Sequence, residues 1–212
     1  GIEGVGEIYA ATFGPKAMTA MIEDTFGRYV EGMDPFHIES LWRKVYGSGF
    51  TQRPDVSLMG VLSGIEIALW DIIGKSLNKP IYELIGGRVH EKLRSYTYIY
   101  PDIAKGQDDS IYWNAEASAE RAAHYMKLGF TGIKFDPAAP YSSFDPRQQS
   151  LESMALCSKF CKLIREAVGD KADLLFGTHG QFTASGAIRF AKQIEQYNPL
   201  WFEEPTPPDR SA

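Results

Sequence analysis

The amino-acid sequence predicts an α/β protein in which a mostly helical first part precedes a parallel β-sheet. The first observation is a repeating order of short apolar runs, near residues 95, 134, 175 and 202, with a helical pattern between each pair. Strands that alternate with helices form a parallel sheet, which stays open or closes into a barrel. The second observation is that polar residues follow three of these runs. Parallel α/β folds place their chemistry at that carboxyl edge.

The first part of the chain, up to Gly87, is predicted to be helical after a short opening strand. Residues 1–12 have the pattern of a strand with Gly-rich turns. Helical spacing follows over 15–31 and 35–46, with Asp34 as the expected N-cap of the second helix.

Residues 57–78 are predicted to form one long apolar helix that ends before Pro80. In an exposed helix, Gly60, Gly64 and Gly74 would each cost about 1 kcal/mol relative to Ala. Their presence therefore predicts that this helix packs closely against a neighbouring segment.

The second part of the chain carries the strand–helix repeat. A long loop rich in Pro, Ser and Tyr is expected after the second strand, and its length suggests a functional role. The predicted strands cover 93–100, 132–136, 174–176 and 200–202, the predicted helices cover 115–128, 150–168 and 183–196, and the loop covers 137–148.

Composition excludes several classes of function. The chain has 212 residues, 22 basic and 27 acidic, so its formal net charge is −5, and no basic cluster suggests nucleic acid as a partner. No apolar run approaches the ~20 residues of a membrane span, and no signal peptide is visible. Cys157 and Cys161 share a helix face and are predicted to be core residues in a reducing compartment, so we expect a cytoplasmic protein.

Four stretches of this chain are similar to the enolase superfamily, in its mandelate racemase/muconate lactonizing branch. The segment SGIEIALWDIIGKSLNKPIYELIGG resembles the end of that family's capping domain, and GFTGIKFD resembles its second barrel strand. FGTHGQ and FEEP resemble the ends of the third and fourth strands. The capping segment followed by WFEEP is the most specific part of this pattern.

The resemblance implies an α+β capping domain followed by a (β/α)7β barrel. Residues 1–90 would be the capping domain without its first strand, and residues 91–212 would be the first half of the barrel, strands 1–4. We therefore expect the chain to be part of a longer protein and to form a homo-oligomer. The other half of the barrel would supply a third metal carboxylate and, in many members of the family, a His-Asp dyad.

The resemblance also implies a Mg²⁺ site. Members of the family abstract a proton next to a carboxylate, and a divalent cation with oxygen ligands stabilises the enediolate that forms. Glu203 matches the family's second metal ligand, with a solvated carboxylate as the alternative. Gly177 stands where many members carry the first ligand, an Asp. We therefore expect Asp136, at the end of the neighbouring strand, to take its place, with His179 close by.

Two residues are candidates for catalysis. His179 sits where sugar-acid dehydratases of the family keep a general acid, a role that suits an imidazole, and it could instead bind the metal. Lys134 occupies the first position of the family's K-x-K motif and could contact the substrate carboxylate or position a base. Its alternative role is a salt bridge to Asp136 or Glu203. The base would come from the His-Asp dyad, because Asp136 replaces the second lysine of the motif.

The resemblance predicts a Mg²⁺-dependent dehydratase of acid sugars, similar to galactonate dehydratases. A cycloisomerase, a racemase and a non-catalytic ligand-binding barrel are the alternatives, the last favoured by Gly177. Gln181 is a candidate substrate contact, or else a helix-start residue. Further candidates for contacts with sugar hydroxyls are Tyr141 in the long loop, and Thr51, Gln52 and Arg53 in the first part of the chain.

Overall fold

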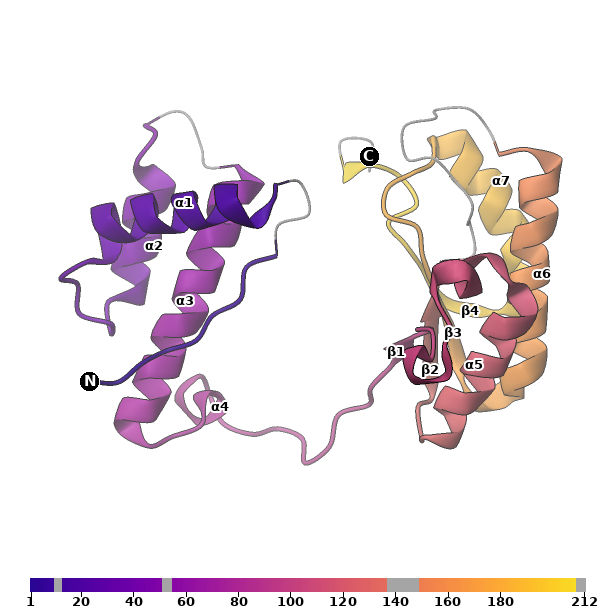
Figure 1. The fold of residues 1–212 in the computed structure, drawn as a ribbon, viewed down its shortest axis with the longest axis horizontal. Coiled ribbons are helices and arrows are strands. Elements are labelled where there is room, and N and C mark those ends of the chain that lie inside the picture. The colour runs from indigo at the N-terminus through magenta and orange to yellow at the C-terminus, as the bar shows by residue number, and fades with distance from the viewer. Residues whose placement is uncertain (10–12, 51–54, 137–148, 209–212) are drawn as a thin grey trace. The chain divides into compact units, whose positions relative to one another are not determined.

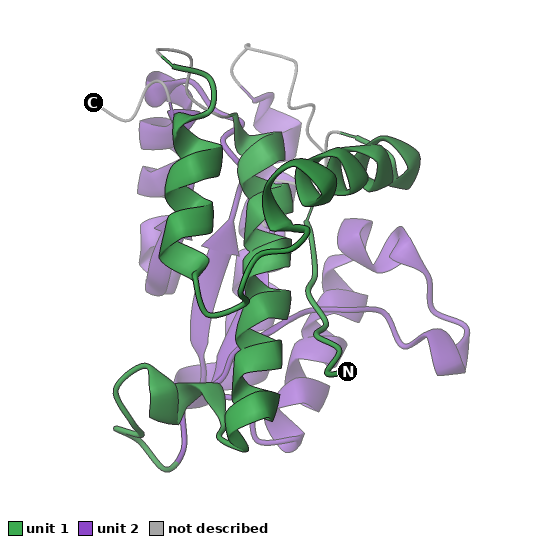
Figure 2. Cartoon of the chain, turned by 90° about the vertical axis from the view of Figure 1, so that its left-hand side faces the viewer, with its two compact units in different colours: residues 1–91 green, residues 92–212 purple. Residues whose placement is uncertain are grey.

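A computed structural model describes residues 1–9, 13–50, 55–136 and 149–208. The chain divides into two compact units, Gly1–Glu91 (unit 1) and Lys92–Ala212 (unit 2) (Figures 1 and 2). Each unit has its own cluster of buried apolar side chains. The boundary falls where the sequence changes from a helical pattern to a strand–helix repeat.

Unit 1 contains helices and no strand in its described residues. Buried side chains from the three longer helices, among them Met18, Leu41, Val45, Val61 and Leu62, form its core. The helices are α1 (Pro15–Thr25), which continues as a π-helical turn over Phe26–Val30, α2 (Ile38–Gly47), α3 (Val56–Leu77) and the short α4 (Ile81–Leu84).

The predicted opening strand is wrong, because residues 1–9 form no strand. This segment runs along α3 in unit 1 (Figure 1). The backbone N–H of Val5 donates to Asp71, and the Lys75 ammonium donates to the carbonyl of Glu3. Side chains of the helix therefore satisfy backbone groups that would otherwise need a partner strand.

The predicted N-cap at Asp34 is also wrong. The second helix begins at Ile38, with His37 in the N-cap position. The Asp34 carboxylate instead accepts a hydrogen bond from the backbone N–H of Phe36, which closes a turn before the helix. Aspartate hydrogen-bonds the backbone two residues on in such turns as readily as it caps helices.

The expectation that no segment reaches the length of a membrane span is wrong for the long helix α3. Its 22 residues, with a mean hydropathy of 1.7, satisfy that test by length and composition. The core helix of a soluble protein passes the same test. Seven residues of α3, including Val61, Leu62 and Leu69, are buried, whereas most of the apolar stretch that meets the test is not.

Unit 2 contains a parallel sheet in the order β1-β2-β3-β4. Helices α5, α6 and α7 connect successive strands and lie on one side of the sheet (Figure 1). The predicted strand–helix order is therefore confirmed. The strands are β1 (Thr97–Tyr98), β2 (Gly132–Phe135), β3 (Asp173–Gly177) and β4 (Pro199–Glu203), and the helices are α5 (Ala115–Lys127), α6 (Leu151–Val168) and α7 (Ala184–Ile194).

Strand β1 is much shorter than the predicted 93–100. It lies at the edge of the sheet, and only Thr97 and Tyr98 pair with β2. Before it, the Arg94 side chain donates to Thr131 and forms an ion pair with Asp173 at the start of β3. Arg94 therefore takes part in side-chain contacts at the amino edge of the sheet rather than in a strand.

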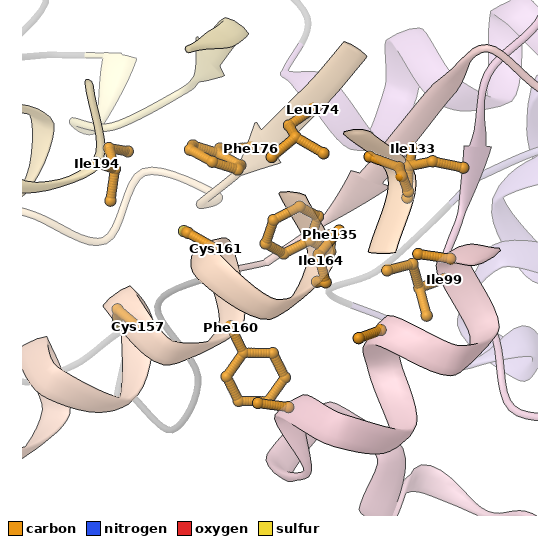
Figure 3. Packing of buried hydrophobic residues seen from close by; sticks show 14 of the residues in the cluster. Ile99, Ile133, Phe135, Cys157, Phe160, Cys161, Ile164, Leu174, Phe176 and Ile194 are labelled. Carbon is orange, nitrogen blue, oxygen red and sulfur yellow. The ribbon is translucent and has the colours of Figure 1, made fainter. Parts of the chain in front are cut away.

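Alternate residues of the strands build the core of unit 2. Ile133, Phe135, Leu174 and Phe176 are buried in one cluster with residues of α6 (Figure 3). Cys157 and Cys161 are free thiols in this cluster, as predicted. Burial is the main cause that raises the pKa of the Cys157 thiol to about 12 and the pKa of Cys161 well above its usual value. Both thiols therefore stay protonated and unreactive.

The packing of α3 against residues 1–9 generates a stability prediction for unit 1. A Cβ at Gly64 would lie 2.3 Å from Cγ1 of Ile8 and 3.1 Å from the carbonyl of Glu7. The helical preference of Ala over Gly favours Gly64→Ala by about 1 kcal/mol. Overpacking costs about 1–3 kcal/mol. We expect Gly64→Ala to lower the free energy of unfolding by roughly 1 kcal/mol in urea titrations.

Gly27→Ala is the matched control, because Gly27 is helical and has open space around its Cβ position. We expect this control to be neutral or slightly stabilising. Equal stability of the two variants would contradict the close packing of residues 1–9 on α3.

Candidate functional site

Four ionisable side chains lie at the carboxyl edge of the sheet in unit 2. Lys134 is in β2 and Asp136 follows it, His179 follows β3, and Glu203 ends β4. Parallel pairing places the ends of β2, β3 and β4 at the same edge. The structure joins these four residues into two ion pairs, Lys134 with Glu203 and Asp136 with His179.

Lys134 and Glu203 form their ion pair across the intervening strand β3. Nζ of Lys134 lies 2.6 Å from Oε1 of Glu203, and the two side chains are 15% and 33% exposed. Gly177 is the register partner of Glu203, and a Cβ at Gly177 would lie 3.1 Å from Cε of Lys134. The missing side chain at Gly177 therefore leaves the space through which Lys134 reaches Glu203.

His179 and Asp136 form the second pair. Nδ1 of His179 lies 3.6 Å from Oδ2 of Asp136, which gives an ion pair when the imidazole is protonated. The Asp136 side chain is 11% exposed, whereas that of His179 is 62% exposed. A largely buried carboxylate therefore stands next to an imidazole that is open to solvent.

The ends of β3 and β4 are joined beyond their last paired residues. The buried Thr178 hydroxyl contacts the carbonyls of Glu203 and Glu204 at 2.8 and 3.1 Å. The N–H of Gly180 donates to the carbonyl of Glu204, and the N–H of Phe182 donates to that of Pro205. These bonds fix the segment that carries His179.

Two residues at this edge adopt the left-handed backbone conformation. His179 has φ of +56° and Glu204 has φ of +44°. Such a conformation costs a residue with a side chain roughly 1–3 kcal/mol, and strained residues of this kind cluster at functional sites. Glu204 lies after the end of β4, and its side chain is exposed.

Tyr98 is a site residue that the sequence analysis missed. It is the register partner of Lys134. Burial, with a further contribution from the Asp136 carboxylate, raises the pKa of the Tyr98 hydroxyl well above its ordinary value. The hydroxyl therefore stays neutral beside Asp136. The predicted strand 93–100 ends at Tyr100 rather than at Tyr98, so the strand pattern did not single out this residue.

The remaining candidates are placed differently. Gln181 lies in the segment between β3 and α7, and its Oε1 is buried without a hydrogen-bond partner in the described part of the chain. Tyr141 falls outside the described residues, and so do Arg53, Thr51 and Gln52.

Asp136 and Glu203 fit a Mg²⁺ ion by ligand type, because Mg²⁺ prefers carboxylate oxygens. Their number is insufficient, since no group of three His, Cys, Asp or Glu residues that could hold a metal occurs within the described ranges. The two carboxylates are the partners of His179 and Lys134, respectively. Within the described residues, Asp136 and Glu203 therefore do not make a metal site by themselves.

Comparison with known proteins places this geometry in a family. Residues 1–86 match the family described as the N-terminal domain of mandelate racemase / muconate lactonizing enzyme. Residues 117–212 match the family described as enolase C-terminal domain-like. The chain belongs to the mandelate racemase/muconate lactonizing branch of the enolase superfamily.

Solved structures of mandelate racemase/muconate lactonizing enzymes share this fold. One from Sulfitobacter sp. is 52% identical, with a TM-score of 0.90 over 97% of this chain and 52% of that one. One from Jannaschia sp. CCS1 is 49% identical, with a TM-score of 0.91 over 99% of this chain and 54% of that one. The fold class is thus the predicted one, an N-terminal cap followed by part of a C-terminal barrel domain.

Curated relatives include two named sugar-acid dehydratases. A D-xylonate dehydratase from Haloferax volcanii is 33% identical over 99% of this chain and 49% of its own length. A D-gluconate/D-galactonate dehydratase from Picrophilus torridus is 31% identical over 86% of this chain and 44% of its own length. This chain spans about half the length of the curated relatives that it matches.

The Thr178 contact generates a prediction about this edge. Thr178→Val keeps the shape of the side chain but removes the hydroxyl from its two carbonyl partners. We expect the free energy of unfolding to fall by about 1–2 kcal/mol in urea titrations. Thr178→Ser, which retains the hydroxyl, should lose less. A larger loss in the serine variant would contradict a stabilising role of this hydrogen bond.

Proposed function

We propose that the protein containing this chain is a Mg²⁺-dependent dehydratase of acid sugars. The observation that carries the proposal is the His179–Asp136 pair at the carboxyl edge of the sheet, in a family whose curated relatives include named sugar-acid dehydratases. In this proposal unit 1 is a capping domain and unit 2 is the first half of a (β/α)7β barrel. The protein is a cytoplasmic homo-oligomer.

Glu203 and Asp136 would hold the Mg²⁺ ion, together with a third carboxylate from another part of the protein. The bound ion would stabilise the negative charge that develops on the substrate carboxylate when the neighbouring carbon loses its proton. The ligand type of both side chains supports this assignment. The Thr178 contact with the carbonyl of Glu203 holds the backbone of one of these ligands in place.

His179 would act as the general acid. Loss of the α-proton and cleavage of the neighbouring C–O bond give an enol, which becomes a 2-keto-3-deoxy acid. The leaving hydroxide takes a proton from the imidazolium and departs as water. The contact of Asp136 with Nδ1 supports this role, because the carboxylate engages that nitrogen and leaves Nε2 for the substrate.

Lys134 would bind the substrate carboxylate through its ammonium group. Its ion pair with Glu203 and its position 5.9 Å from the centre of the Tyr96 ring support a charged side chain at this place. The base that removes the α-proton would come from a His-Asp dyad elsewhere in the barrel. Gln181, whose buried Oε1 has no partner in the described residues, would bind a substrate hydroxyl, and Tyr141 and Arg53 would be further contacts.

The test is a screen of the full-length protein against a panel of aldonic acids with Mg²⁺. We expect a 2-keto-3-deoxy acid from at least one member, loss of turnover in EDTA and recovery when Mg²⁺ is restored. In that reaction His179→Asn should lower kcat by about 10²-fold or more, since a positioned general acid contributes that much. His90→Asn, a substitution in unit 1, is the control and should retain activity.

Absence of turnover on every acid, together with absence of bound metal, would contradict the proposal. That result would favour a non-catalytic ligand-binding protein, for which the glycine at position 177 and the Lys134–Glu203 pair are the motivating observations. Isomerisation or racemisation of an acid without loss of water would point instead to a cycloisomerase or a racemase.

A further inference from the structure

The space next to Gly177 affects which positive charge can pair with the Glu203 carboxylate. We propose that Gly177 is a positioning residue that lets Lys134 pair with Glu203, so that the Lys134 ammonium and a divalent cation compete for the same carboxylate. The inference rests on the proposed function only in taking Glu203 as a ligand of that cation.

The first step is steric. Lys134 is on β2 and Glu203 is on β4, so the lysine side chain has to pass over β3 to make its contact. At the crossing point a Cβ on residue 177 would lie 3.1 Å from Cε and 3.8 Å from Nζ of Lys134. A methyl group placed there is tighter than an ordinary van der Waals contact. Any side chain at position 177 would therefore make Lys134 shift from its present path by a few tenths of an ångström.

The second step is electrostatic. Nζ of Lys134 lies 2.6 Å from Oε1 of Glu203, and both groups are more than half shielded from water. A pair in such a position is screened less than a pair on the surface. A divalent cation that takes Glu203 as a ligand must therefore displace the ammonium or share the carboxylate with it. Either event weakens binding of the cation and loosens Lys134.

The competition links the two parts of the site. While no cation is bound, Lys134 neutralises Glu203 and is held across β3. When a cation takes the carboxylate, Lys134 is released toward the open edge, where it becomes available for the carboxylate of a substrate. The resident charge of the pair thus prevents Glu203 from standing uncompensated in a half-buried place.

The experiment measures Mn²⁺ binding to the full-length protein without substrate, through the loss of the free-ion signal in electron paramagnetic resonance. Two variants weaken the pair by different routes. Lys134→Met removes the ammonium, whereas Gly177→Ala makes Lys134 shift by a few tenths of an ångström without changing the net charge. We expect Lys134→Met to bind Mn²⁺ about twofold to fivefold more tightly than the wild type, the range that partly exposed ion pairs represent, and Gly177→Ala to bind it more tightly by a smaller factor.

Matched controls separate competition from general charge effects. Lys162→Met removes an exposed lysine whose partner Glu166 is 3.9 Å away on the same helix, and Gly27→Ala adds a methyl group in open space. Neither control should change the affinity. Thermal unfolding without metal checks that all variants are folded.

Several results would overturn the inference. These are unchanged or weaker Mn²⁺ affinity in both Lys134→Met and Gly177→Ala, the same gain in Lys162→Met, or no binding in any variant. The outcome is separable from that of the proposed function. A protein that binds Mn²⁺ as expected but converts no acid sugar would refute the function alone. Turnover with unchanged Mn²⁺ affinities would refute the competition alone.

Discussion

The parallel pairing of β2, β3 and β4 is the constraint on which the candidate site depends. Lys134 and Glu203 are 69 positions apart in sequence and meet because successive strands end at the same edge. Side-chain alternation then separates two environments. Ile133, Phe135 and Leu174 enter the core beneath the helices, while Lys134 and Glu203 interact on the other side of the strands.

Gly177 gives this edge its particular character. In a strand, glycine normally weakens packing, and here it leaves room for an ammonium to cross. The same residue is the reason why the proposed metal ligands come from neighbouring strands, since Gly177 has no ligand atom. Hydrogen bonds of the Thr178 hydroxyl and of the backbone N–H groups of Gly180 and Phe182 join the segment after β3 to the end of β4. The edge is therefore organised by hydrogen bonds and ion pairs.

The order of elements could be predicted from the sequence because hydrophobic periodicity and punctuating glycines are local signals. The long helix at 57–78 and the four strands are within a few residues of the predicted positions, except that β1 is shorter. Residues 1–9 could not be predicted, because an extended segment that packs on a helix has the same pattern as a strand. The N-cap prediction at Asp34 was wrong for a similar reason, because Asp side chains accept backbone hydrogen bonds both in turns and at helix N-caps.

The contacts within the site were harder to predict from the sequence. The positions of Asp136, His179 and Glu203 at strand ends follow from the strand pattern alone. Their pairing does not, because it depends on register and on the space above Gly177. Lys134 illustrates the limit, since its sequence position allowed a salt bridge to either Asp136 or Glu203, and the structure places its ammonium against Glu203. Tyr98 was missed because the length of the edge strand β1 depends on its pairing with β2, which the sequence pattern does not show.

A double-mutant cycle on the free energy of unfolding tests the central claim most directly, that Lys134 and Glu203 interact across Gly177. The cycle compares Lys134→Met, Glu203→Gln and the double variant in the metal-free full-length protein. The structure predicts a coupling energy of about 1 kcal/mol, because the two residues are in direct contact. Losses that add within about 0.3 kcal/mol would contradict the pair, since independent sites behave in that way.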